Sequence, residues 1–221
     1  MASATTVRQF DQNFLNAPTP RISVESLWET ELTSDKLATY LNSAQRKPRP
    51  VGLAGGNTPA GRLTILAVAV GSRVLLIRFR NREKASQAAR KLLKDELLCS
   101  PKNILHAFDM GPLALSLYSD MHLLVTNAVD IQSACSCKEN RVVANAVQFA
   151  VASTKYSGIH RTNIDTAFGS DAWDEDKPSS LALKAWLAAY LPLVGDMEQR
   201  FGEAPKINTG TMPEDVRRFT Y

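Results

Sequence analysis

The chain has 221 residues, of which 44% are hydrophobic and 22% are charged. This composition is typical of a globular protein with a hydrophobic core, and it excludes a disordered, collagen-like or disulfide-stapled chain. Lys and Arg number 26 against 22 for Asp and Glu, and the resulting formal net charge of +4 permits a nucleic-acid partner without requiring one.

The first half of the chain is predicted to contain most of the strands. Residues 1–33 are expected to form an N-terminal arm, because the segment starts with a polar stretch interrupted by prolines. An apolar face in residues 34–44 predicts a helix. Apolar segments rich in β-forming residues predict strands at residues 51–53, 63–70 and 73–79. Gly71 and Ser72 separate the last two segments and predict a tight hairpin turn.

The rest of the chain is predicted to be mainly helical. An amphipathic helix is expected at residues 83–98, with alanine and leucine on one side. Further helices are expected at residues 112–119, 129–137, 142–156 and 181–201, and short strands at residues 104–107 and 122–125. Pro192 is expected to break the last helix, and residues 202–221 are expected to form a C-terminal tail. This order predicts one α/β domain, residues 34–201, with a mixed sheet of about five strands and helices on both faces.

The sequence shows no export or membrane signal. The N-terminus lacks a basic-then-apolar leader, and the longest apolar runs are too short to span a bilayer. The three cysteines, Cys99, Cys135 and Cys137, lack zinc-ribbon spacing and are expected to be free thiols in a reducing compartment. We therefore expect an intracellular protein, nuclear or cytoplasmic, without a cofactor.

Two further patterns could be taken for functional sites. The glycine-rich residues 52–61 lack the Gly-Lys-Ser/Thr ending of a P-loop and the GxGxxG spacing, so they indicate a strand-to-loop turn. His106, His122 and His160 show no metal-ligand spacing and are expected to be structural or exposed. Neither pattern predicts catalysis.

A series of short motifs follows the order of a known family. Val51-Gly52-Leu53 is followed by an apolar hairpin that begins at Gly61. The later segments are residues 102–115, Val129-Asp130-Ile131-Gln132, Ser170-Asp171-Ala172-Trp173 and the helix from Leu181. Over about residues 45–201 this order resembles the DEDD-type 3′–5′ exonuclease domain of ribonuclease D and the Werner syndrome exonuclease. The resemblance implies a ribonuclease-H-like fold.

The resemblance also implies where a metal site would lie. The family holds two divalent metal ions with four carboxylates, because hard cations need anionic oxygen ligands. Aligned with the family's motifs, the four ligand positions hold Ala54, Gly56, Gly111 and Ala189. Gly111 comes five residues after His106. With all four acids missing, the resemblance implies a degenerate site with no metal and no catalysis.

One alternative stays open. Asp109 lies two residues before Gly111, so a gap in the alignment would restore the third acid. No acid occurs between Val51 and Arg82 to replace the first pair. We therefore expect a catalytically inactive, exonuclease-like scaffold in RNA metabolism or small-RNA silencing. The alternative is an active metal-dependent 3′–5′ exonuclease with displaced ligands.

The expected partner is a protein or a second copy of the chain, with RNA as a further ligand and no membrane. The densest basic region supplies the nucleic-acid-binding candidates Arg78, Arg80, Arg82, Lys84, Lys91 and Lys94. Such a basic track would bind phosphates without reading base sequence. The pattern favours a simpler interpretation, the solvated face of an amphipathic helix. Trp173 and Trp186 are interface candidates that are otherwise explained as core residues.

Overall fold

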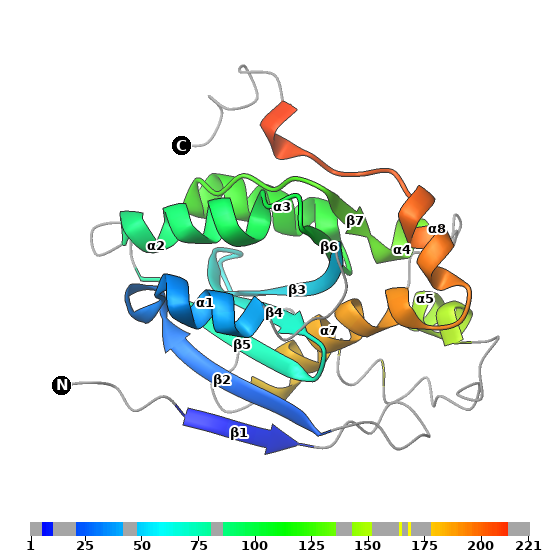
Figure 1. Ribbon diagram of the computed structural model, residues 1–221, viewed down its shortest axis with the longest axis horizontal. Helices are drawn as coiled ribbons and strands as arrows, with labels where there is room; N and C mark the ends of the chain where they lie inside the picture. The colour runs from blue at the N-terminus through cyan, green and yellow to red at the C-terminus, as the bar shows by residue number, and fades with distance from the viewer. Residues whose placement is uncertain are drawn as a thin grey trace.

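The chain forms a seven-stranded mixed sheet with helices on both faces (Figure 1). The computed structural model describes residues 6–10, 21–41, 48–80, 86–135, 143–151, 164, 168 and 178–211. The predicted α/β architecture is confirmed, and the sheet is larger than the expected five strands.

The sheet is built around an antiparallel meander. Its strands are β1 (Thr6–Phe10), β2 (Ile22–Trp28), β3 (Arg49–Asn57), β4 (Leu63–Val70), β5 (Arg73–Arg78), β6 (Asn103–Ala107) and β7 (Ala128–Asp130). Across the sheet they follow the order β1-β2-β5-β4-β3-β6-β7. β3, β4 and β5 form the meander, while β6 runs parallel to both β3 and β7. The predicted turn between β4 and β5 is confirmed, with Gly71 at a φ of 59°.

Helices cover the two faces of the sheet in separate groups. They are α1 (Ser34–Leu41), α2 (Gln87–Leu92), α3 (Met110–Met121), α4 (Ile131–Ala134), α5 (Val143–Val151), α7 (Pro178–Tyr190) and α8 (Met197–Glu203). α2 continues into a π-helical turn at Leu93–Leu98, and 3-10 turns lie at Glu29–Glu31, Leu191–Leu193 and Thr209–Thr211. The first three helices share one hydrophobic core with the sheet, and the last four share the other. Figure 1 shows α3 and α7 on opposite sides of β3.

Alternation along β3 separates the two cores. Val51 and Leu53 belong to the core under α1, α2 and α3, and Ala54 belongs to the core under α7. Gly52 is where α7 comes closest to the sheet. A Cβ at this position would lie 1.9 Å from the carbonyl oxygen of Ala185. A glycine is therefore required for α7 to sit where it does.

The expected N-terminal arm is wrong for residues 22–28. They form β2, which pairs in parallel with β5, and Thr6–Phe10 add β1 on its outer side. Ile22, Val24 and Leu27 are buried. Apolar side chains that alternate in this way bury more surface in a sheet than in a free arm, so pairing of this segment with the sheet is favoured. The domain therefore begins before residue 34.

The strand expected at residues 122–125 is also wrong. Leu123 and Val125 are buried like strand residues, but their N–H groups bond to the carbonyl of Leu117 and the hydroxyl of Thr209. The strand of this region is β7 instead. Thr209 comes from the expected C-terminal tail, so the described part of that tail is docked on the domain. None of the described helices is both long and apolar enough to cross a membrane.

Candidate functional site

A crevice lies between β3 and β6, because the chain leaves these two strands toward opposite sides of the sheet. β3 pairs with β6 only from Arg49 to Gly52, and beyond that register the two strands separate. From β3 the chain turns to one side into the β4–β5 hairpin, and from β6 it continues to the other side through α3 to β7. A switch of this kind at the carboxyl ends of parallel strands leaves room for a ligand.

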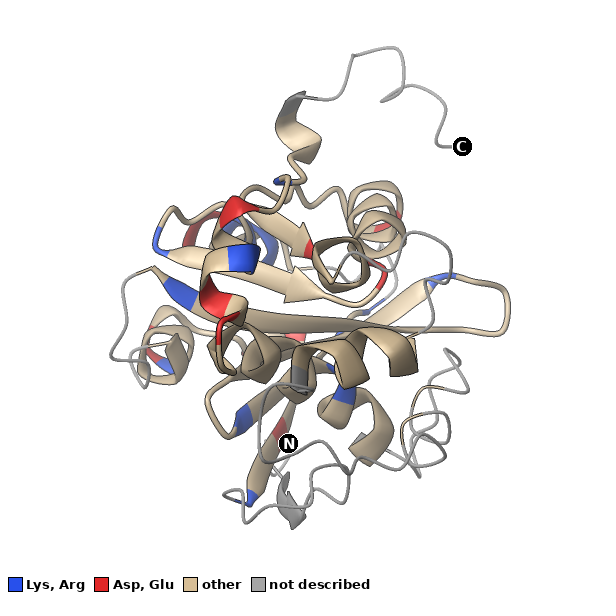
Figure 2. Ribbon diagram, turned by 90° about the vertical axis from the view of Figure 1, so that its right-hand side faces the viewer, with Lys and Arg blue, Asp and Glu red and all other residues tan. Residues whose placement is uncertain are grey.

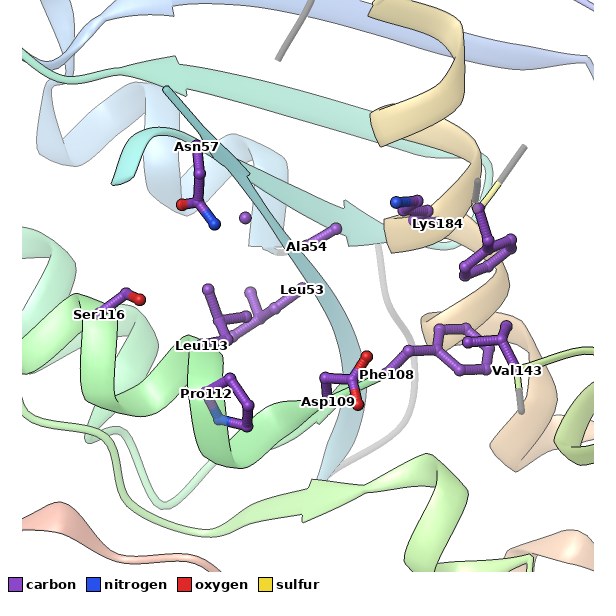
Figure 3. A pocket seen from close by; sticks show the side chains of 12 residues that line it. Leu53, Ala54, Asn57, Phe108, Asp109, Pro112, Leu113, Ser116, Val143 and Lys184 are labelled. Carbon is purple, nitrogen blue, oxygen red and sulfur yellow. The ribbon is translucent and has the colours of Figure 1, made fainter. Parts of the chain in front are cut away.

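A cavity of about 170 Å³ lies at this switch (Figure 3). Its lining residues come from β3, from the β6–α3 junction and α3, from α5 and from α7, together with Phe168. They are Leu53, Ala54, Gly55, Asn57, Phe108, Asp109, Pro112, Leu113, Ser116, Val143, Phe168 and Lys184. Because these residues are far apart in the sequence, the cavity exists only in the folded chain. We call it the switch pocket.

The β3 wall of the switch pocket consists of one leucine, two small residues and one amide. At Gly55, an added Cβ would lie 2.8 Å from the Cδ1 of Leu113, so α3 packs closely here. The register between β3 and β4 shifts between Gly56 and Asn57, and such a bulge re-aims the side chain that follows it. The Oδ1 of Asn57 is buried and has no hydrogen-bond partner among the described residues. An unpaired buried acceptor is costly unless a ligand or water satisfies it.

The junction of β6 and α3 supplies the carboxylate of the switch pocket. Asp109 has a left-handed backbone, with a φ of 55°, which only a few residue types adopt readily. Two partly buried hydrogen bonds hold this conformation: the Asp109 N–H donates to Oε1 of Gln132 at 3.0 Å, and the Met110 N–H donates to Oδ1 of Asp130 at 2.9 Å. The turn places the Asp109 side chain on the lower wall in Figure 3.

α7 supplies the cation of the switch pocket. Lys184 is only 8% exposed, and its Nζ lies 5.4 Å from the centre of the Phe168 ring. Figure 3 shows its nitrogen directed toward the β3 wall, across from Asp109. Lys184 is the one charged residue between Pro178 and Val194. None of the sequence motifs indicates Lys184, although a single charge in an apolar helix is a signal that could have pointed to it. Neither do they indicate the amide of Asn57.

The structure brings together only part of the predicted acid positions. Ala54 lines the switch pocket, and Gly56 lies between two residues that do. Gly111 is exposed in the first turn of α3, and a Cβ there would meet nothing within 4 Å. Ala189 packs on Gly52: a Cβ added to Gly52 would lie 2.4 Å from the backbone nitrogen of Ala189. The residue that α7 presents to the pocket is therefore Lys184.

The predicted basic candidates that the structure describes lie in two regions, at β5 and its end, and on α2 and the π-helical turn that follows it. The guanidinium groups of Arg78 and Arg80 lie 5.8 and 5.2 Å from the centre of the Trp28 ring. Lys91 forms an exposed ion pair of 2.7 Å with Asp95. Figure 2 shows Lys and Arg positions interleaved with Asp and Glu positions on the side it presents.

The other candidates have different environments. Lys94 is half-buried on the π-helical turn after α2, and Arg82 and Lys84 lie outside the described residues. Trp186 is 2% exposed and stacks on Tyr190, with 5.1 Å between ring centres. It is a core residue and offers no surface to a partner. Trp173 lies outside the described residues.

His106, the residue used to locate the third acid position, is part of the core. Its ring packs edge-on against Phe201 with 5.4 Å between ring centres. Burial, together with the nearby charge of Lys206, lowers the pKa of His106 to about 3. The imidazole is therefore neutral near pH 7 and has a structural role, as the sequence indicated.

Comparisons with known proteins agree on the fold. No protein-family model and no curated protein sequence matches the chain. The crystal structure of the Nibbler EXO domain of Aedes aegypti is similar, with a TM-score of 0.52 at 12% identity over 76% of this chain and 86% of that one. A nuclease solved in its apo form also has a TM-score of 0.52, at 14% identity over 88% of this chain and 84% of that one. The chain has the ribonuclease-H-like fold of DEDD-type 3′–5′ exonuclease domains.

Proposed function

We propose that the chain is a catalytically inactive, exonuclease-like domain that acts as a binding scaffold in RNA metabolism or small-RNA silencing. Its main partner would be a protein or a second copy of the chain, with RNA as a further ligand. One observation carries the proposal: among the described residues, the ionisable groups that line the switch pocket are one carboxylate, Asp109, and one ammonium, Lys184. Catalysis by this fold family needs four carboxylates in that place.

The described residues of the switch pocket do not fit two divalent metal ions. Mg²⁺ and Mn²⁺ prefer oxygen ligands, and several carboxylates must offset the positive charge that is brought together. On β3, Ala54 offers a methyl group, and on α7, Lys184 adds a positive charge that repels a divalent ion. Among the described residues, no group of three or more His, Cys, Asp and Glu side chains could hold a metal ion.

Asp109 favours the alternative of an active nuclease with displaced ligands. Its carboxylate lines the switch pocket, on the element where the fold family places its third acid. The two functions are separated by incubating 3′-labelled and 5′-labelled single-stranded RNA with the full chain in Mg²⁺ or Mn²⁺. We expect no shortening beyond a parallel reaction in EDTA. Progressive shortening from the 3′ end that disappears in Asp109→Asn would replace the scaffold function with the nuclease function.

Partner binding needs its own measurement. Light scattering over a range of protein concentrations tests whether the chain associates with itself. Fluorescence anisotropy with single-stranded RNA at increasing salt tests the second ligand, since phosphate contacts weaken with ionic strength. RNA binding through the basic candidates predicts that Arg80→Gln weakens it at low salt. A monomer with no RNA affinity at low salt would leave a different protein as the partner.

A further inference from the structure

We propose that Lys184 gives the switch pocket a resident cation, and that the pocket binds a small phosphate-bearing, hydroxyl-bearing ligand without any divalent metal ion. The inference rests on the non-catalytic function proposed above, because it assigns the pocket a ligand in place of a metal site. Three features of the pocket carry it.

The first feature is the position of the positive charge. Lys184 is 8% exposed and lines the pocket from the α7 side. A buried ammonium attracts an anion more strongly than one in open solvent, because less water screens its charge. Lysine binds phosphate as a compact point charge with three donors. An ammonium at this place does for a phosphate group what a bound metal ion would otherwise do.

The second feature is the unsatisfied acceptor on the opposite wall. The Oδ1 of Asn57 is buried and lacks a hydrogen-bond partner among the described residues. An amide oxygen accepts hydrogen bonds and donates none, so the ligand must bring a donor to it. A hydroxyl group is the donor that phosphate-bearing metabolites and RNA ends share. Ser116, on α3, also lines the pocket and adds a second hydroxyl-compatible contact.

The third feature is the separation of charge and apolar surface. The Asp109 carboxylate lies on a different wall from Lys184 (Figure 3), so it repels a phosphate from its own side and accepts hydroxyl donors there. The rings of Phe108 and Phe168 meet edge-on at 4.9 Å between centres and form the apolar part of the lining. This arrangement orients a ligand with its phosphate toward Lys184 and its hydroxyls toward Asn57 and Asp109.

The test is a calorimetric titration of the full chain in EDTA with inorganic phosphate and with ribose 5-phosphate. We expect both to bind, and ribose 5-phosphate to bind more tightly because it also reaches Asn57. Lys184→Met keeps the length of the side chain and removes its charge, so it should weaken both ligands by about tenfold or more. Lys102→Met, at an exposed turn, is the matched control and should leave both affinities unchanged.

A second variant separates a binding role from a folding defect. Asn57→Ala should weaken ribose 5-phosphate and leave inorganic phosphate unchanged, which a general loss of structure would not do. A 5′-phosphorylated oligoribonucleotide and its unphosphorylated form then distinguish the sources: a preference for the phosphorylated end points to RNA, and equal weak binding of both points to a free sugar phosphate.

Two results would overturn the inference. One is no binding of either probe in EDTA by the folded wild-type chain. The other is binding that requires Mg²⁺ and persists in Lys184→Met. Either failure is distinct from failure of the proposed function, which is decided by shortening of labelled RNA and not by phosphate affinity.

Discussion

Replacing Gly52 by alanine should be among the most damaging single changes in this chain. The added Cβ would lie 1.9 Å from the carbonyl oxygen of Ala185 and 2.4 Å from the backbone nitrogen of Ala189. Real Cβ contacts are essentially never under 3.0 Å, so α7 would have to retreat from β3 by about 1 Å. Both clashing atoms are backbone atoms, and no side-chain rotation relieves them.

The retreat of α7 would cost packing on one whole face of the sheet. Leu187 is fully buried on this helix and Trp186 nearly so, and both would lose close contacts. Overpacking a core costs about 1–3 kcal/mol and sometimes more, and a clash with a helix backbone belongs at the upper end. We therefore expect Gly52→Ala to lower the free energy of unfolding by about 3 kcal/mol or more.

Urea unfolding followed by circular dichroism measures this loss as a lower midpoint. Gly202→Ala is the matched control, because position 202 lies in α8 and a Cβ there meets nothing within 4 Å. Alanine is favoured over glycine in a helix, so the control should gain about 0.5–1 kcal/mol. A Gly52→Ala protein within about 1 kcal/mol of wild type would refute the close approach of α7 to β3.

Three further predictions concern buried polar groups. The pKa of His106 is about 3 in the folded chain against 6.5 in the unfolded one, so acid protonates the unfolded chain first. The free energy of unfolding should therefore fall as the pH drops below 6.5, by up to ~1.4 kcal/mol per pH unit. Urea unfolding at a series of pH values measures this slope, and His106→Gln should lack the part that comes from His106. Arg90→Met breaks the 3.0 Å ion pair with fully buried Glu29 and should cost about 3 kcal/mol. Lys91→Met on the same helix breaks an exposed pair and should leave the urea midpoint nearly unchanged, so equal losses in midpoint would contradict the burial of Glu29. Tyr40→Phe removes the hydroxyl that donates to the Val68 carbonyl at 2.8 Å and should cost about 1–2 kcal/mol, so an unchanged midpoint would argue against that bond.

The apolar pattern predicted the central fold because each central strand is buried on both faces. The pattern predicts a hairpin at residues 63–70 and 73–79, and β4 and β5 match these bounds closely. The break at Pro192 is confirmed by the 3-10 turn that separates α7 from α8. These elements depend on local chemistry, namely β-branched runs, a turn glycine and a proline without an N–H group.

The errors arose where long-range partners decide the structure. Residues 22–28 carry an alternating pattern, but their partner strand, β5, lies about fifty residues away in the sequence. Leu123 and Val125 look like strand residues, but the groups that satisfy their backbone come from the end of α3 and from Thr209. A local window contains none of these partners.

The sequence by itself determined the α/β class, the order of the motifs and the lack of Asp and Glu along β3. Tertiary structure alone decided which residue of α7 faces β3 in the switch pocket. An alignment error of a few residues on a helix selects a different face, because successive side chains turn by about 100°. The close approach at Gly52 sets that rotation, and it directs Ala189 to the strand and Lys184 to the pocket. The lack of Asp and Glu along β3 was therefore visible in the sequence, and the lysine that lies beside β3 in the pocket was visible only in the fold.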